Sequence, residues 1–204
     1  LIRAYEELLA YHARVRGMTP TELGWAERIS ILTRKFFGVD LDDQAVQIAR
    51  LNLLLRALAK QELLPSLTDN IRRGNSLISG SELELRPYFG DAWEEKRPFN
   101  WQREFPDIFP LARPEPVEGG GFDIIIGNPP YVQLSMEGLG DERVRRYLRH
   151  RYELSMGRLN TFGFFISRGL QLLRDGGLLG FIVPNTVLTQ EYYYQLRKLI
   201  LEQS

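Results

Sequence analysis

Residues 122–131 read Phe-Asp-Ile-Ile-Ile-Gly-Asn-Pro-Pro-Tyr, and the organisation of the chain follows from this stretch. It begins with a short apolar run rich in β-branched residues, which is the pattern of a fully buried parallel strand. It ends in a corner, Asn128 to Tyr131, which we expect to be stiff because a residue before proline stays extended and each proline ring fixes its own φ. Neither proline has an N–H group, so the two prolines offer only backbone acceptors.

Such a corner is suited to holding an amino group. The Asn128 side-chain carbonyl and a backbone carbonyl can together accept both hydrogens of one planar amine, and Tyr131 supplies a flat ring for stacking. Two accepted hydrogen bonds free the lone pair of the nitrogen for attack on a positively charged methyl donor, through preorganised dipoles and alignment. The alternative is a rigid turn that only closes a strand.

The corner resembles the catalytic motif of adenine-specific DNA methyltransferases of type II restriction-modification systems, IIG-like members of the N-6 adenine methylase family. The resemblance implies methyl transfer from S-adenosylmethionine to the exocyclic amino group of an adenine that is flipped out of double-stranded DNA. Asn128 and the Pro129 carbonyl would hold the amino group, and residues 157–163 resemble the segment that packs beside the corner. The catalytic residues implied are Asn128, Pro129, Pro130 and Tyr131.

Around the corner, helical patterns alternate with short apolar runs. This alternation predicts an α/β fold with a mainly parallel sheet, and the resemblance implies the Rossmann-like fold of S-adenosylmethionine-dependent methyltransferases. Thr19 is expected to cap the second helix, and Gly176-Gly177 to end a later one as a left-handed cap. The expected helices cover residues 1–15, 20–34, 43–60, 141–150, 160–174 and 189–201, and the other expected strands cover 36–40, 71–78 and 178–183.

The predicted cofactor-binding residues are Asp40, Leu41 and Asn75. Asp40 ends a predicted strand, and ligands of open parallel sheets lie at the carboxyl ends of strands, where an acid commonly binds ribose hydroxyls. By resemblance, Asp40 holds the ribose of S-adenosylmethionine, Leu41 lies against its adenine, and Asn75, where many relatives carry Asp, hydrogen-bonds that adenine. Asp40 has an alternative role as a helix cap, for which Asp42 and Asp43 are better placed, and Asn75 has an alternative in an ordinary turn.

Residues 79–121 show no regular pattern and include a tract rich in Pro, Glu and Gly, so we expect a flexible surface insertion. The corner also occurs in proteins that resemble protein-glutamine and RNA-guanine methyltransferases, which usually lack such a long insertion. Within it, the aromatic stretch 99–110 resembles the segment that precedes the catalytic strand in restriction-modification methyltransferases. This feature favours DNA adenine over protein glutamine or RNA guanine as the substrate.

Composition is that of an ordinary globular protein, with 44% hydrophobic and 25% charged residues among 204. There is no cysteine, no apolar run long enough to cross a bilayer and no signal-peptide pattern, which fits a cytoplasmic protein without a membrane span. His12 and His150 fit packing or surface roles better than metal ligation. The net charge is zero, and the one dense arginine cluster, at 143–151, is either a phosphate contact or a solvated helix face.

The resemblance also predicts what these residues lack. The glycine-rich cofactor loop and the central first strand of the sheet are expected before Leu1, and the target-recognition domain is expected after Ser204. The chain is therefore expected to be a partial catalytic domain that is inactive by itself, and an inactive remnant is the remaining alternative. A nuclease domain or subunit accompanies some relatives, but downstream of Asp107 the only lysine is Lys198, so nothing in the sequence supports one.

Overall fold

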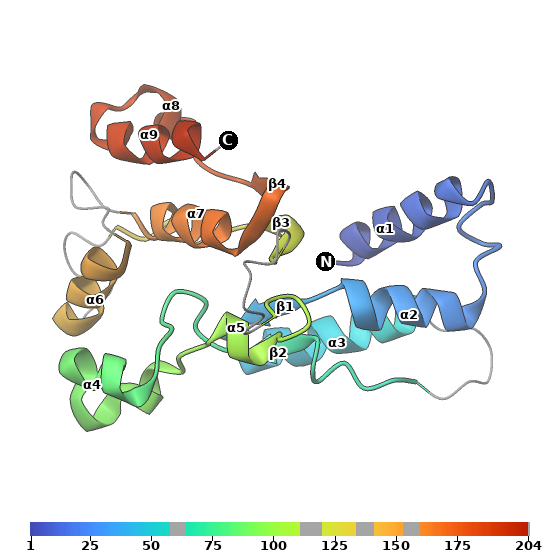
Figure 1. The fold of residues 1–204 in the computed structure, drawn as a ribbon, viewed down its shortest axis with the longest axis horizontal. Coiled ribbons are helices and arrows are strands. Elements are labelled where there is room, and N and C mark those ends of the chain that lie inside the picture. The colour runs from blue at the N-terminus through green and yellow to red at the C-terminus, as the bar shows by residue number, and fades with distance from the viewer. Residues whose placement is uncertain (58–63, 111–119, 134–140, 153–159, 204) are drawn as a thin grey trace. The chain divides into compact units, whose positions relative to one another are not determined.

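The computed structural model describes residues 1–57, 64–110, 120–133, 141–152 and 160–203 (Figure 1). The chain divides into two compact units, Leu1–Asn75 and Ser76–Ser204. Within these described ranges, each unit combines helices with one two-stranded parallel sheet. The prediction of an α/β fold with parallel strands is therefore confirmed, whereas an incomplete Rossmann-like sheet that lacks its central first strand stays a prediction.

In the described residues of unit 1, three helices pack around a short sheet. Strand β1 pairs in parallel with β2, with Asp40 opposite Arg73. The core of the unit includes the fully buried side chains of Tyr5 and Leu53, and the Tyr5 hydroxyl donates a hydrogen bond to the Arg28 carbonyl (3.0 Å). The elements are α1 (Ile2–Val15), α2 (Trp25–Lys35), β1 (Gly38–Asp40), α3 (Asp43–Ala57) and β2 (Ile71–Arg73).

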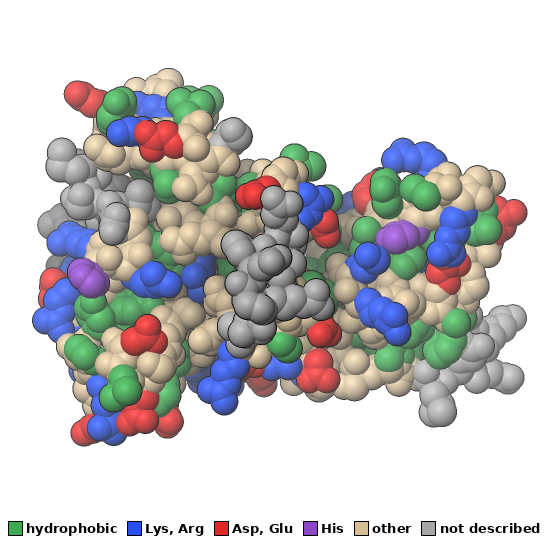
Figure 2. Space-filling model, viewed as in Figure 1, with side chains coloured by type: hydrophobic (Ala, Val, Ile, Leu, Met, Phe, Trp, Pro, Cys, Tyr) green, Lys and Arg blue, Asp and Glu red, His purple; other side chains and the backbone are tan. Residues whose placement is uncertain are grey.

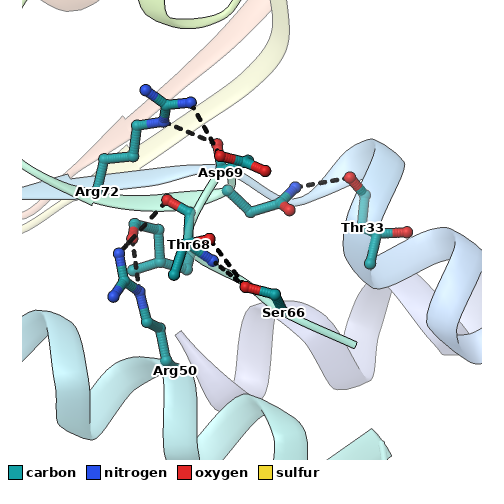
Figure 3. Close-up of polar contacts among 8 residues, drawn as sticks. Thr33, Arg50, Ser66, Thr68, Asp69 and Arg72 are labelled. Atoms are coloured by element: carbon teal, nitrogen blue, oxygen red, sulfur yellow. Dashed lines mark hydrogen bonds and ion pairs between the residues drawn. The ribbon is translucent and has the colours of Figure 1, made fainter. Parts of the chain in front are cut away.

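Polar side chains fix the start of β2 against its neighbours. Figure 3 shows Arg50 of α3 reaching the approach to β2, where its guanidinium donates to the carbonyls of Ile71 (2.6 and 2.9 Å) and Thr68 (3.4 Å). The buried Asn70 side chain donates to the Thr33 carbonyl at the end of α2 (2.6 Å). The Arg50 bonds satisfy carbonyls at the start of a strand of three residues, and the Asn70 bond satisfies a carbonyl of the last turn of α2, which has no partner within the helix.

The second helix begins later than predicted. Thr19 and Glu22 do interact, because the Thr19 backbone N–H and hydroxyl both donate to Glu22 Oε2 (2.6 and 2.7 Å). The residues nevertheless form a turn, and α2 starts at Trp25 after Gly24, which is extended (φ −61°, ψ 154°). Only the Glu22 half of a capping box is therefore formed, and it closes one turn that ends before Gly24. The predicted end of the next helix, near Lys60, lies outside the described residues.

Unit 2 contains the other strand pair, in which β3 runs parallel to β4. Helix α7 packs on β4, and the aromatic ring of Phe162 and the side chain of Ile166 share a core with Leu179 and Phe181. The elements are α4 (Glu82–Phe89), η1 (Gly90–Lys96), α5 (Trp101–Glu104), β3 (Phe122–Gly127), α6 (Glu142–Tyr152), α7 (Thr161–Leu172), β4 (Leu173–Phe181), α8 (Thr186–Thr189), η2 (Glu191–Tyr193) and α9 (Tyr194–Glu202).

The stretch from Ser79 onward has more regular structure than predicted. Ser81 and Glu84 form a capping box at the start of α4, and Phe89 of that helix is buried. Further on, the rings of Trp101 and Phe105 lie edge-on to Phe122 at centroid distances of 5.9 and 6.3 Å. These helices are only one or two turns long, which is too short for a visible hydrophobic period. Residues 111–119 of the predicted flexible tract lie outside the described part.

The prediction of a fully buried catalytic strand is wrong for one face of β3. Ile124 is 59% and Ile126 is 55% exposed, although both belong to the apolar run. In the described residues, β3 has one neighbouring strand, β4, and α7 packs on the other side of that pair. Alternating side chains of a strand point to opposite faces, so a run that is apolar throughout leaves one row uncovered here.

Gly176 is left-handed as predicted but does not cap a helix. Helix α7 ends at Leu172, and β4 begins at the next residue. Gly176 (φ +70°) lies inside β4, in an irregularity between the pairs Phe122–Leu173 and Ile124–Leu178. Its positive φ therefore forms part of a bulge, in which β4 has more residues than the paired stretch of β3. The last helix, predicted for residues 189–201, begins after the extended Gln190 as η2 and continues as α9, and α8 precedes it.

Candidate active site

The corner that follows β3 is open to solvent. Asn128, Pro130 and Tyr131 are exposed and Pro129 is buried. The Tyr131 hydroxyl lies 2.8 Å from the Ile182 carbonyl oxygen and 3.0 Å from Asn128 Oδ1. One hydroxyl hydrogen thus serves two acceptors, which ties the corner to the residue after β4 and orients the Asn128 side chain.

A threonine on the neighbouring helix holds the far side of the corner. The Thr161 hydroxyl donates to the Pro130 carbonyl and accepts from the Val132 N–H (3.1 Å), and the Thr161 N–H donates to the Val132 carbonyl (2.9 Å). Gln133 and Asn160 add an antiparallel bridge. The predicted packing of this segment beside the corner is confirmed for residues 160 and 161, while 157–159 lie outside the described residues. Sequence reasoning did not single out Thr161, since its partners lie about thirty residues away.

Two acceptors of the corner remain for a substrate. Within the described part of the chain, no group donates to the Pro129 carbonyl. Asn128 Oδ1 receives only a share of the Tyr131 hydroxyl hydrogen, and an amide oxygen has two lone pairs. The corner can therefore accept two hydrogens of an amine, at Asn128 and at Pro129, but its third acceptor, at Pro130, is engaged by Thr161.

The Tyr131 ring packs against a neighbouring ring and is partly exposed to solvent. It meets Phe162 of α7 in an edge-on arrangement, with centroids 6.2 Å apart and an interplanar angle of 65°. The residue is 46% exposed, which leaves ring surface for stacking on a planar group. A second tyrosine lies near the start of α7. Its hydroxyl, on Tyr193, is 3.4 Å from Asn160 Nδ2, and burial raises the pKa of Tyr193 above its ordinary value.

In unit 1, the predicted cofactor residues gather at one edge of the sheet. Asp40 is the last residue of β1 and is exposed, and its Oδ1 accepts from the Asp42 N–H (2.8 Å). Asp42 in turn accepts from the Gln44 N–H (2.9 Å) at the start of α3. Asp42 therefore caps the helix, as expected, and Asp40 is left with an oxygen that no described residue contacts. Leu41 is 51% exposed.

Asn75 lies at the same edge because of the strand pairing. Asp40 is opposite Arg73, and the Gly74 N–H donates to the Asp40 carbonyl (2.9 Å), so Asn75 follows at the carboxyl end of β2. Arg73 Nε also lies 3.3 Å from the Leu41 carbonyl oxygen. The structure thus brings Asp40, Leu41 and Asn75 together in unit 1, and it places the four residues of the corner together in unit 2.

Most of the arginine cluster on α6 is used within the protein. Arg143 pairs with Asp141 (3.0 Å), Arg145 pairs with Glu142, and Arg146 donates to the Pro87 carbonyl (3.2 Å). Arg149 and Arg151 are exposed. On the face drawn in Figure 2, the coloured basic and acidic side chains are interspersed, and no continuous basic patch is visible among them.

Other kinds of site find little support in the described residues. The His150 ring accepts or donates a 2.6 Å hydrogen bond with Tyr88, which is a packing role. The described ranges contain no group of three or more acidic or histidine side chains placed to hold a metal ion. None of their helices is long and apolar enough to cross a membrane.

Comparison with known proteins places this geometry in a family context. Residues 34–204 match the family model described as Eco57I restriction-modification methylase. The chain is 29% identical, over 182 residues, to the type II restriction enzyme and methyltransferase RM.Eco57I of Escherichia coli, covering 84% of this chain and 16% of that protein. It is 32% identical to the putative type II restriction enzyme and methyltransferase RM.MjaORFECS2P of Methanocaldococcus jannaschii, covering 97% of this chain and 26% of that protein.

A solved structure shows the same fold. It is a nuclease-deletion mutant of the type ISP restriction-modification enzyme LlaGI in complex with a DNA substrate mimic, and it matches 98% of this chain and 16% of its own with a TM-score of 0.59. The sequence identity is 13%, so the likeness concerns the fold alone. The chain spans between 16% and 26% of the lengths of the two relatives named above.

Proposed function

The chain belongs to the Eco57I restriction-modification methylase family, and on that basis we propose that it forms most of the catalytic domain of a site-specific DNA methyltransferase. The reaction proposed is transfer of a methyl group from S-adenosylmethionine to the exocyclic amino group of adenine. The observation that carries the proposal is the corner after β3, where Asn128 and Tyr131 are exposed, Pro129 is buried, and acceptors remain at the Asn128 side chain and the Pro129 carbonyl. The names of the relatives, which are restriction enzymes and methyltransferases, support the substrate class.

The corner would act on the amine by orientation. Asn128 Oδ1 and the Pro129 carbonyl would accept its two hydrogens, which directs the nitrogen lone pair away from the plane of the base. The Tyr131 ring, already held by its hydroxyl, would stack on a base flipped out of the duplex. No strongly basic side chain is required, because fixed dipoles lower the barrier as charge develops on the nitrogen.

The edge of the sheet in unit 1 fits the cofactor. The uncontacted oxygen of Asp40 suits a ribose hydroxyl, the exposed Leu41 side chain suits the adenine ring, and Asn75 offers an amide to its polar edge. S-adenosylmethionine, when bound, would supply a methyl group from its positively charged sulfur and would leave as the neutral thioether S-adenosylhomocysteine. These residues would bind and orient the donor and would take no part in proton transfer.

The test is transfer of labelled methyl groups to unmethylated DNA by the complete protein that contains these residues. We expect N6-methyladenine as the product, and we expect Asn128→Ala to lower kcat by roughly 10²- to 10³-fold, which is typical for removal of one stabilising dipole. The thermal unfolding temperature should change little, because Asn128 is exposed.

The matched control is Asn52→Ala, which removes the same side chain from α3 and should leave the rate unchanged. Wild-type activity in Asn128→Ala would reject the role of that residue. Label that appears in protein or RNA instead of DNA would overturn the proposed substrate and favour the protein-glutamine or RNA-guanine alternative.

A further inference from the structure

We propose that Thr161 is a positioning residue that decides which carbonyl of the corner is left for the substrate. The inference rests on the proposed function, because it concerns how the same corner receives an amine. The corner contains two successive proline carbonyls, at residues 129 and 130, and a planar amine beside Asn128 needs one of them. Thr161 engages the carbonyl of Pro130 and leaves that of Pro129 free of described donors.

The contacts of Thr161 are specific to a hydroxyl. Its oxygen donates to the Pro130 carbonyl and also accepts from the Val132 N–H at 3.1 Å. Among side chains of this size, only Ser and Thr can both donate and accept a strong hydrogen bond at one atom, whereas the Cys thiol does both weakly. Valine has nearly the same shape but would leave both the Pro130 carbonyl and the Val132 N–H without this partner.

The support for these bonds is rigid. Thr161 is the first residue of α7, is 5% exposed, and is followed by the fully buried Phe162. Its backbone N–H, one of the groups that a helix start leaves without an intrahelical acceptor, donates to the Val132 carbonyl at 2.9 Å. The exit of the corner is therefore fastened to a buried helix by one side-chain group and one backbone group.

Loss of the hydroxyl should affect the chemical step more than substrate binding. The Thr161 backbone bond and the Tyr131 hydroxyl bonds would keep the corner in place. The Pro130 carbonyl would be released, however, and a misplacement of the reacting amine on the order of 1 Å costs about 10²-fold in rate. Binding of DNA outside the corner and of S-adenosylmethionine at Asp40 does not involve this hydroxyl.

The experiment measures kcat, KM for DNA and Kd for S-adenosylmethionine in the complete protein. We expect Thr161→Val to lower kcat by roughly 10- to 100-fold, with KM and Kd within about twofold of the wild-type values. Thr161→Ser, which retains the hydroxyl, should restore kcat to within about threefold. Thr33→Val is the matched control, since it removes a hydroxyl that donates to Ile29 within α2, and it should leave kcat unchanged.

Thermal unfolding separates positioning from folding. If Thr161→Val unfolds at a much lower temperature, Thr161→Cys, with its weaker donor, should give a folded protein with an intermediate kcat. Wild-type kcat in a folded Thr161→Val or Thr161→Cys variant would overturn the inference, and so would failure of Thr161→Ser to recover the rate. Absence of DNA methylation by the wild-type protein would instead reject the proposed function, and the inference with it.

Discussion

At the scale of single residues, the corner after β3 depends on hydrogen bonds that arrive from outside it. Asn128 is oriented by the Tyr131 hydroxyl, which also donates to the carbonyl of Ile182. The prolines restrict φ, but they do not determine where the Asn128 side chain points. Stacking and orientation therefore reside in two different parts of Tyr131, the ring and the hydroxyl.

Substitutions of Tyr131 can separate these two contributions. Tyr131→Phe keeps the ring and removes the hydroxyl, so we expect a loss of roughly fivefold in kcat/KM, equivalent to one hydrogen bond of about 1 kcal/mol. Tyr131→Ala also removes the stacking surface, and the loss should be larger by a further factor of about ten or more. Measurement of kcat/KM on DNA for both variants separates the contribution of the ring from that of the hydroxyl. Equal losses would show that the ring contributes nothing.

Asp40 gives a second prediction at this scale. Asp40→Asn keeps an oxygen that can accept from the Asp42 N–H but removes the charge proposed to bind ribose hydroxyls. A hydrogen bond to a charged group contributes about 1.5–3 kcal/mol, so Kd for S-adenosylmethionine should rise at least about tenfold. Calorimetric titration of the complete protein measures this Kd. The control is Asp69→Asn, because Asp69 is an exposed carboxylate that pairs with Arg72. An unchanged Kd would place the ribose elsewhere.

At the scale of elements, the position of the corner depends on how β3, β4 and α7 meet. Just before β3, Gly121 adopts φ +132°, and a Cβ atom there would lie 2.5 Å from the Arg174 backbone nitrogen. The backbone is thus in close contact where β4 begins its irregular stretch. The register of the strand pair, and hence the place where β3 ends in Asn128, requires glycine at this position.

This contact predicts a stability difference between adjacent glycines. Gly121→Ala should destabilise the chain by more than about 2 kcal/mol, because both the φ angle and the close backbone are incompatible with a Cβ atom. Gly120→Ala should have little effect, since the nearest atom to its Cβ would be 3.8 Å away. For a chain of this size the first change lowers the unfolding temperature by several degrees, at about 2–4 °C per kcal/mol. Similar unfolding temperatures for the two variants would contradict the packing described.

The start of α6 predicts a pH dependence. Hydrogen bonds from Lys96 (2.7 Å) and Arg143 hold the pKa of Asp141 well below its ordinary value. A carboxyl whose pKa is lowered by folding adds stability above its unfolded pKa, and that stability is lost as the pH falls toward the folded value. Asp141→Asn should therefore be less stable than wild type at pH 7 by up to about 1 kcal/mol. The difference should shrink progressively below about pH 4. Denaturant unfolding at several pH values tests this, and a difference that grows on acidification would refute it.

At the scale of the whole molecule, charge limits what the chain can do with DNA. The net charge is zero, and three of the five arginines on α6 interact within the protein. Duplex affinity that comes from phosphate contacts depends on the number of cations that neutralise phosphates. The chain thus has few such cations to offer from α6: Arg149 and Arg151 are exposed, and Arg151 also interacts with the Tyr147 hydroxyl.

The salt dependence of binding to a random duplex measures that number. Replacing both Arg149 and Arg151 by Gln should flatten the slope of log K against log salt by up to about 2, at roughly 0.9 per phosphate contact. Arg143→Gln should leave the slope unchanged, because Arg143 already pairs with Asp141. If the double variant kept the wild-type slope, α6 would be a solvated face without phosphate contacts.

Motifs within a few residues, through their resemblance to a known family, were enough to predict the family, and local patterns predicted the parallel strands and the ends of β1 at Asp40 and of β3 just before Asn128. The predicted ends of the other two strands were wrong, because β2 ends at Arg73 and β4 at Phe181. Prolines, apolar runs and the acid after a strand are patterns within a few residues, so they can be recognised without knowledge of the fold. Asp42 as the cap of α3 is confirmed for the same reason. Sequence reasoning was wrong where elements are shorter than a hydrophobic period, as in α4 and α5, and where a local signal such as Thr19 forms a turn that does not continue.

The tertiary structure alone decided the features that join distant parts of unit 2. The exposed row of Ile124 and Ile126 depends on which neighbours cover β3, and the place of Gly176 in a bulge depends on strand register. The choice between the two proline carbonyls depends on Thr161, which lies 31 residues beyond Pro130 in the chain. A pattern of residue types records what a segment can do. Which of its groups are covered or hydrogen-bonded is determined by the segments that pack against it.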